Sequence, residues 1–132
     1  MKVLKIVEKD RVGLMADIAL ALSEVGINIE NISATGVQGK AVIVFEVREE
    51  EEDKAVDVLT KKGYKVLSEE MILIKLRDKP GELARISKML KDRKVNFTNL
   101  QVMSRDGKET LVGLTVEQPE EAKRVLREFI VK

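Results

Sequence analysis

The fold is decided by a stretch that occurs twice in this chain. It reads DRVGLMADIALALSEVGINIENI over residues 10–32 and DKPGELARISKMLKDRKVNFTNL over residues 78–100. At an offset of 68 the two copies are identical at seven of 23 positions, which include an Asp, a Gly and two Asn. A repeat of about half the chain indicates two small units. We place them at residues 1–69 and 70–132.

The composition of the chain excludes several classes of function. Its 132 residues carry a net charge of +1 with acids and bases interleaved, so no basic domain suggests nucleic acid. Cysteine and histidine are absent, which removes thiolate metal sites and the usual general base near neutral pH. We expect no metal, no cofactor and no enzyme activity, although carboxylate or lysine chemistry stays open.

The cellular setting can also be narrowed from the sequence. No run of eighteen apolar residues is present, so we expect no membrane span. The start, MKVLKIVEKD, soon becomes charged and does not resemble a signal peptide. These features predict a cytoplasmic protein.

Each copy begins with the same two predicted elements. The short branched runs VLKIV (residues 3–7) and MILIKL (residues 71–76) are typical of strands. After an Asp-x-x-Gly segment, apolar residues recur at helical spacing and predict a helix lying on a sheet. Gly26 is suited to end the first helix, whereas Lys94 stands at its place in the second, which predicts a different cap.

The remaining elements follow in the same order in both copies. INIENISATG and VNFTNLQVMS predict second strands, Gln38-Gly39 and Asp106-Gly107 predict hairpin turns, and KAVIVFEV and TLVGLTV predict third strands. Second helices follow in EEEEDKAVDVLTKKG and PEEAKRVLREF. YKVLSEE supplies a fourth strand in the first unit, but only residues 130–132 remain in the second. The last strand there is predicted to be short or missing.

This element order predicts an α+β fold of two ferredoxin-like βαββαβ sandwiches in tandem. The helices cover one face of each sheet and leave the other bare. In the third strand Ile43, Phe45 and Val47 point one way and Val42 and Val44 the other, so both faces are apolar. Because a half-exposed strand is usually polar on its open side, we expect pairing of the units or of chains, most simply a homodimer.

The corner between the first strand and first helix is the candidate site. Backbone N–H groups at a helix start suit a carboxylate, and Gly13 and Gly81 let a ligand approach the backbone. Asp10 and Asp78 could accept from an ammonium group, and the following Asn residues offer a side-chain amide. Together these groups describe the head group of a free amino acid. A purely structural interpretation, with Asp as a helix cap and Gly as a turn, stays open because duplication preserves caps as well as sites.

Two other interpretations have little support. The acidic run of residues 49–53 lacks the spaced ligands of a calcium loop and precedes a helix, where negative charge is ordinary. RNA-binding modules of the same element order stack bases on strand aromatics, and here Phe45 and Phe97 are isolated. We therefore expect no nucleic-acid partner.

The two repeated stretches resemble the opening helix and second strand of an ACT domain, with Val12 where that family often has Pro. The resemblance covers essentially the whole chain as two tandem units. It implies a small-molecule sensor whose effector is a free amino acid. The positions it implies for ligand binding are Asp10, Val12, Gly13, Leu14, Asn28 and Ile29 in the first copy, and Asp78, Pro80, Gly81, Glu82, Leu83, Asn96 and Phe97 in the second.

The match to the family's serine-binding members is incomplete. Those members carry Asn where this chain has Asp10 and Asp78, and a His where it has Glu8 and Leu76. Serine is therefore not the effector that we assume. The copies also differ from each other, since Glu82 replaces Leu14, so one site can bind while the other is only structural.

The sequence thus predicts an amino-acid-binding regulatory protein of two ACT-type domains with no catalytic domain attached, which alters its contacts with itself or with a metabolic enzyme. The resemblance leaves two alternatives. One is a regulatory subunit of an amino-acid biosynthetic enzyme, similar to the small subunit of acetolactate synthase. The other is a purely structural interaction module.

Overall fold

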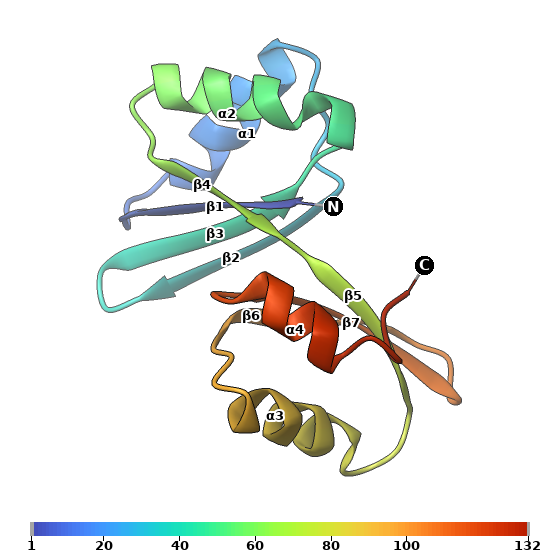
Figure 1. Cartoon of the computed structure of the whole chain (residues 1–132). Coiled ribbons are helices and arrows are strands. Elements are labelled where there is room, and N and C mark those ends of the chain that lie inside the picture. Colours follow the sequence, from blue (N-terminus) through green and yellow to red (C-terminus); the bar gives the residue numbers. More distant parts are fainter. Residues whose placement is uncertain (1, 132) are drawn as a thin grey trace. The chain divides into compact units, whose positions relative to one another are not determined.

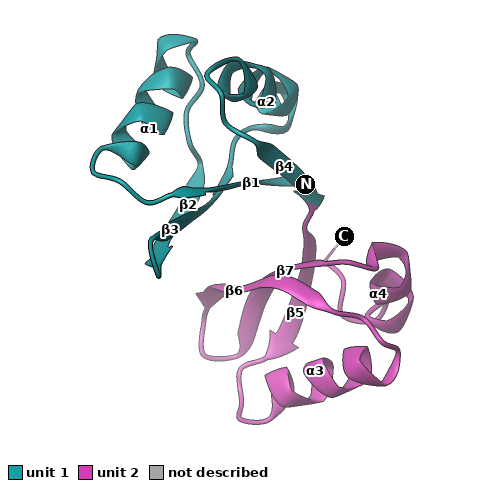
Figure 2. Cartoon of the chain, turned by 90° about the vertical axis from the view of Figure 1, so that its left-hand side faces the viewer, with its two compact units in different colours: residues 1–69 teal, residues 70–132 magenta. Residues whose placement is uncertain are grey.

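The computed structural model describes residues 2–131, which fall into two compact units that meet between Glu69 and Glu70. Figure 2 colours the two units separately. Each has its own antiparallel sheet and its own helices. Within residues 2–131, no helix is long and apolar enough to cross a membrane.

The first unit contains four strands, two α-helices and one turn of 3₁₀-helix (Figure 1). In chain order they are β1 (Lys2–Lys9), α1 (Leu14–Glu24), β2 (Asn31–Val37), β3 (Lys40–Glu46), η1 (Glu49–Glu51), α2 (Glu52–Lys61) and β4 (Val66–Glu70). The strands lie in the order β2-β3-β1-β4, so β2 and β4 form the edges of the sheet. This is the predicted βαββαβ sandwich.

The core of the first unit lies between the sheet and its two helices. Ile6 on β1 and Ile43 and Phe45 on β3 alternate with residues on the other face and pack against the apolar stripe of α1. That stripe includes Ile18 and Leu22, both fully buried. Burial of one such side chain contributes about 1.5–3 kcal/mol, so the periodic positions hold the helix on the sheet.

The second unit repeats this arrangement with fewer strands. It contains β5 (Ile72–Arg77), α3 (Glu82–Asp92), β6 (Phe97–Arg105), β7 (Glu109–Val116) and α4 (Pro119–Val125), and its sheet has the order β5-β7-β6. Ile74, Leu114, Ile86 and Leu90 lie in its core, at positions that match those of the first unit.

The last strand of the second unit is reduced to a single bridge between Ile74 and Ile130. The N–H of Lys75 donates to the carbonyl of Phe129, and the N–H of Val131 donates to Leu73. The helix α4 has only seven residues, and among the described residues that follow it only this bridge pairs with β5. The predicted α+β class, with two ferredoxin-like sandwiches and a shortened final strand, is confirmed.

The cap of α3 differs from the sequence prediction. Gly26 and Lys94 both adopt a left-handed conformation, with φ of 77° and 60°. In both helices the N–H of the next residue donates to a carbonyl in the last turn. The Ile27 N–H donates to the carbonyl of Leu22, and the Val95 N–H donates to the carbonyl of Leu90. The prediction of a different cap was therefore wrong, because Lys94 accepts the conformation that glycine adopts in the first copy.

Candidate functional site

The corner between β1 and α1 in the first unit is built around a left-handed glycine. Gly13 has φ of 87° and lies just before the first helical residue, with no side-chain cap. A Cβ atom at Gly13 would meet nothing within 4 Å, so the backbone conformation rather than crowding requires glycine there. Among residues 2–131, the backbone N–H groups of Met15 and Ala16 in the first turn have no hydrogen-bond acceptor. The corner therefore presents free donors with partial positive charge.

A cleft of about 410 Å³ opens beside this corner, between the start of α1 and the β2–β3 hairpin. Ala34 is paired with Ile43, and Gly36 with Ala41, so these residues share the face of the sheet that α1 covers. Three of these four strand residues are Ala or Gly. A sheet that packs against a helix usually carries larger apolar side chains at such positions. The small side chains leave the space that forms the cleft, which we call the first corner cleft; its other lining residues are Asp10, Arg11, Gly13, Leu14, Met15, Ala16 and Thr35.

Asp10 supplies a carboxylate without a partner to the first corner cleft. Its Oδ2 atom lies 2.8 Å from the point that a Cβ atom on Gly36 would occupy, so the carboxylate rests against the bare backbone of β2. Its side chain forms no hydrogen bond or ion pair with any of residues 2–131. The Asp10 N–H donates to the carbonyl of Gly39 at 2.9 Å, which fixes the backbone of this residue. The site thus holds a carboxylate that can accept from a cationic group.

The rim of the first corner cleft carries a paired charge. Arg11 donates to Asp17 with an Nη2–Oδ2 distance of 2.8 Å and to the Tyr64 hydroxyl at 3.4 Å. The pKa of Arg11 is raised mainly by the hydrogen bond to Asp17. The guanidinium of Arg11 therefore stays charged. Because Asp17 already neutralises Arg11, this arginine does not compete for the carboxylate of Asp10.

In the equivalent corner of the second unit, an arginine pairs with the aspartate. Gly81 has φ of 91° before α3, as Gly13 has before α1. Arg105 lies opposite Thr110 in the sheet, the place that Gly36 holds opposite Ala41 in the first unit. Its Nη1 atom lies 3.5 Å from Oδ1 of Asp78. The smaller cleft here, of about 330 Å³, therefore has its carboxylate already paired.

The predicted site residues divide between those at a corner and those elsewhere. Asp10, Gly13 and Leu14 line the first corner cleft, while Asp78, Pro80, Gly81, Glu82 and Leu83 line the cleft of the second unit. Val12 is fully exposed and does not line the first corner cleft. Neither Asp10 nor Asp78 acts as a side-chain helix cap, so the simple capping interpretation does not describe these residues.

Within each unit, the predicted asparagine does not lie at the corner that holds the aspartate. Asn28 and Ile29 follow the C-terminal end of α1, about 16 Å of helix from Gly13, and do not line the first corner cleft. Asn28 also precedes β2 by three residues, whereas we expected it to lie near the start of that strand. Asn96 and Phe97 line a separate hollow with Lys94, and the amide of Asn96 donates to Glu117 at 3.1 Å. Within a single unit the structure therefore does not bring the three predicted head-group contacts together.

Sequence reasoning missed the strand residues of both corners. Ala34, Gly36 and Ala41 in the first unit and Arg105 in the second lie far from the Asp-x-x-Gly segment in sequence. One signal was present, because a glycine inside a strand often marks a place where another group approaches the backbone.

Within the described residues, no group of three or more His, Cys, Asp or Glu side chains could hold a metal ion.

Comparisons with known proteins agree with this architecture. The family model described as ACT domain matches residues 2–63. A solved protein from Bacteroides thetaiotaomicron superposes with a TM-score of 0.76 at 18% identity, covering 98% of this chain and 90% of that chain. No curated protein matches the sequence significantly.

Two further similar structures are regulatory subunits of aspartate kinase. The subunit from Thermus flavus has a TM-score of 0.66 at 16% identity, and the ligand-free subunit from Thermus thermophilus has 0.62 at 17% identity. Both alignments cover 96% of this chain and 90% of the other. At these identities the likeness concerns the fold. The first unit therefore matches the ACT domain family model, and the second unit repeats its fold with a shortened last strand.

Proposed function

We propose that this protein is a regulatory protein that binds a free amino acid in the first corner cleft. The observation that carries the proposal is the carboxylate of Asp10, which lies at the cleft without a partner among residues 2–131. A fixed negative charge beside an otherwise small and apolar surface favours a ligand with a compact cationic group. The ammonium group of an amino acid has that charge and size.

The other end of the ligand head group has a natural place at α1. The free N–H groups of Met15 and Ala16 carry the positive end of the helix dipole and suit an α-carboxylate. Asp10 and these donors lie on opposite sides of Gly13 in the chain, and all of them line the same cleft. An amino acid would therefore be held by complementary charges at both ends of its head group.

The wall of the first corner cleft argues for an uncharged aliphatic effector. Ala34, Ala41 and Ile43 contribute apolar surface, and Arg11 is already neutralised by Asp17. An acidic side chain would find no free cation there, and a basic one would find only Asp10, which the ammonium group already uses. We therefore expect Ala, Val, Leu or Ile to bind in preference to Asp, Glu, Lys or Arg.

A thermal-shift panel of the twenty amino acids tests this proposal. A ligand that binds only the folded protein stabilises it by about 2.7 kcal/mol at 100 times its Kd, which raises the melting temperature by several degrees. We expect the shift with aliphatic amino acids, and we expect Asp10→Ala to abolish it. The variant leaves the fold intact because the Asp10 side chain forms no hydrogen bond or ion pair with any of residues 2–131.

Asp78→Ala is the matched control for Asp10→Ala. It removes the equivalent carboxylate of the second unit, which Arg105 already neutralises, and we expect it to retain the amino-acid shift. If none of the twenty amino acids stabilises the wild-type protein, the proposal is wrong and a structural interaction module becomes the better interpretation.

A regulatory subunit of a separate metabolic enzyme is the second candidate function. It is favoured by the two aspartate kinase regulatory subunits, which share the fold over nearly the whole length of both chains. In this form of the proposal, amino-acid binding changes the affinity of the protein for a catalytic chain. By linkage, binding of the catalytic chain must change the affinity for the amino acid by the same factor. Co-purification of the tagged protein with such an enzyme, changed by the amino acid found in the panel, would distinguish it from a free-standing sensor.

We also propose that the protein forms a homodimer through an exposed sheet edge. Strand β2 lies at the edge of the first sheet, all seven of its residues are exposed, and Ile32 and Val37 present apolar side chains. Unpaired edge strands are ready templates for pairing with another chain. Sedimentation should give the mass of two chains, and a compact monomer at micromolar concentration would contradict this assembly.

A further inference from the structure

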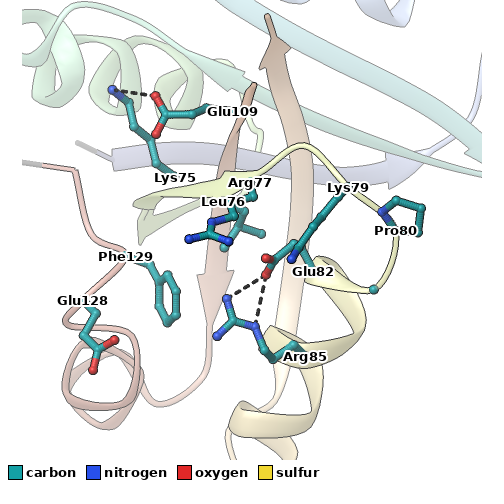
Figure 3. A pocket seen from close by; sticks show the side chains of 11 residues that line it. Lys75, Leu76, Arg77, Lys79, Pro80, Glu82, Arg85, Glu109, Glu128 and Phe129 are labelled. Carbon is teal, nitrogen blue, oxygen red and sulfur yellow. Dashed lines mark hydrogen bonds and ion pairs between the residues drawn. The ribbon is translucent and has the colours of Figure 1, made fainter. Parts of the chain in front are cut away.

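The second unit has a larger hollow on the side of the sheet where its fourth strand is shortened. This hollow has a volume of about 650 Å³ and is drawn in Figure 3. In the first unit the five-residue strand β4 lies beside β1 at the corresponding edge. In the second unit pairing with β5 ends where the N–H of Lys75 meets the carbonyl of Phe129. The edge beyond it, at Leu76 and Arg77, is left to line the hollow.

A buried carboxylate organises the charges of this hollow. Glu82, in the first turn of α3, is only 6% exposed and accepts two hydrogen bonds from Arg85, at 2.7 and 3.1 Å. The pKa of Glu82 is lowered mainly by these two hydrogen bonds. The nearby positive charges of Lys79 and Arg77 lower this pKa further. The carboxylate is therefore ionised at neutral pH and attracts cations from both sides of the loop.

The cations outnumber the carboxylates that could neutralise them. Lys75 lies 4.0 Å from Glu109, and Arg85 is bound to Glu82. The side chains of Arg77 and Lys79 form no hydrogen bond or ion pair with any of residues 2–131, although both line the hollow. In Figure 3 the Lys79 side chain extends toward Glu82, and the Arg77 guanidinium lies on the other side of the Glu82 carboxylate in this view. Two cationic groups thus share a single carboxylate that is already bound to Arg85.

The far wall of the hollow is formed by Phe129 and Arg85. The ring of Phe129 lies under the guanidinium of Arg85, with 5.1 Å between the Cζ atom and the ring centroid. Arg85 thus contacts both Glu82 and this ring. In the view of Figure 3, Glu128 extends beyond Phe129 and away from Arg77. A ligand would meet the cations Arg77 and Lys79 on one side and the Phe129 ring, stacked with Arg85, on the other.

We propose that this hollow, named the Arg77 pocket after its lining by Arg77, Lys79, Glu82, Arg85 and Phe129, binds a small metabolite that carries an oxyanion. The oxyanion, a carboxylate or a phosphate, lies between Arg77 and Lys79, and the body of the ligand packs on Phe129. The pocket shares no residue with the first corner cleft. The inference is therefore independent of the amino-acid proposal.

An NMR titration of the full chain with inorganic phosphate, and separately with malonate, tests the Arg77 pocket at low ionic strength. We expect saturable shifts of the backbone amides of Gly81 and Arg85. Loss of one hydrogen bond to a charged group weakens binding by about tenfold or more, so Arg77→Gln and Lys79→Gln should each do so. Both residues are exposed, and their variants therefore keep the fold. Tighter binding of phosphate or of malonate identifies which oxyanion the pocket prefers.

Two further variants sharpen the test. Lys88→Gln removes an exposed cation on the same helix outside the pocket and should leave the affinity unchanged. Glu82→Gln removes the charge that competes with the ligand for the cations and should tighten phosphate binding. The proposal fails if neither anion gives saturable shifts, or if Lys88→Gln weakens binding as much as Arg77→Gln. Asp10→Ala should leave anion binding unchanged, so failure of one site is distinguishable from failure of the other.

Discussion

The ends of α1 and α3 show how a single residue accepts a conformation set by its neighbours. The residue after each left-handed cap is buried, Ile27 at the end of α1 and Val95 at the end of α3. The chain must turn sharply to place that residue in the core, and the left-handed position makes the turn. Gly26 adopts it without strain, whereas Lys94 does so at a cost of about 1–2 kcal/mol.

Replacing Lys94 with glycine should therefore stabilise the second unit. The gain from relieved backbone strain is partly offset by the greater freedom of glycine in the unfolded chain, so we expect a net increase of about 0.5–1 kcal/mol in the free energy of unfolding. Lys94 is exposed, and its side chain forms no hydrogen bond or ion pair with any of residues 2–131. The measurement is urea denaturation followed by circular dichroism.

The matched control for this change is Gly26→Lys. It places the residue of the second copy at the end of the first helix and should lower the free energy of unfolding by a similar amount. If Lys94→Gly leaves the protein unchanged or less stable, the left-handed lysine is not strained, and the aliphatic part of its side chain must contribute packing that outweighs the strain.

At the scale of elements, the sequence predicted the helices and strands better than their boundaries. Apolar periodicity identified α1 and α3 because Ile18 and Ile86 lie on buried stripes that recur at helical spacing. Strand β2 was predicted to begin at Ile27, but it begins at Asn31, because Ile27 is used to anchor the helix end in the core. Local pattern alone does not separate a buried strand residue from a buried anchor in a loop.

The hairpin between β6 and β7 is an element held by one carboxylate. The Oδ1 atom of Asp106 accepts from the N–H of Lys108 at 2.8 Å and from the N–H of Glu109 at 2.7 Å. These backbone hydrogen bonds, with Glu109 the larger cause, lower the pKa of Asp106. The sequence predicted the turn from Asp106-Gly107, and the structure adds that the side chain of Asp106 closes it.

Asp106 should make the stability of the second unit depend on pH in the acid range. A carboxyl group whose pKa is lowered on folding stabilises the folded state above its unfolded pKa of about 3.9, and this contribution is lost as the pH falls through the folded pKa. Asp106→Ala should therefore be less stable than the wild type at pH 7, and the difference should shrink below pH 4. Asp106→Asn keeps a side-chain acceptor without the charge and should remove the pH-dependent part alone. A difference between wild type and Asp106→Ala that stays constant from pH 7 to pH 2.5 would contradict this account.

At the scale of the whole molecule, duplication kept the fold of the corners and changed their chemistry. The repeated Asp and Gly predicted where each corner lies, and both glycines have the left-handed conformation. What the sequence could not predict is the state of the two aspartates. It depends on the β2–β3 and β6–β7 pairing register, which brings Gly36 beside Asp10 and Arg105 beside Asp78. Contacts across strands are set by that register and not by local sequence.

This difference leads to a prediction about the number of amino-acid sites in the chain. The first corner has a free carboxylate in a cleft of small residues, and the second has its carboxylate paired with Arg105. We therefore expect isothermal titration calorimetry to give one bound amino acid per chain. A stoichiometry of two would mean that Arg105 yields its place to the ligand, and the paired state of Asp78 would then not decide binding.

Converting the first corner into the second should abolish amino-acid binding without unfolding the protein. Gly36→Arg places an arginine beside Asp10, and the resulting ion pair occupies the ammonium position. The backbone of Gly36 is not in the left-handed region, so a side chain there adds no strain of that kind. Gly36→Ala should weaken binding less, because its Cβ atom would lie 2.8 Å from Oδ2 of Asp10 and displace the carboxylate without neutralising it. Arg105→Gly in the second unit is the control and should leave the heat of binding to the first corner cleft unchanged. An amino acid that still binds Gly36→Arg with the wild-type affinity would show that Asp10 does not hold its ammonium group.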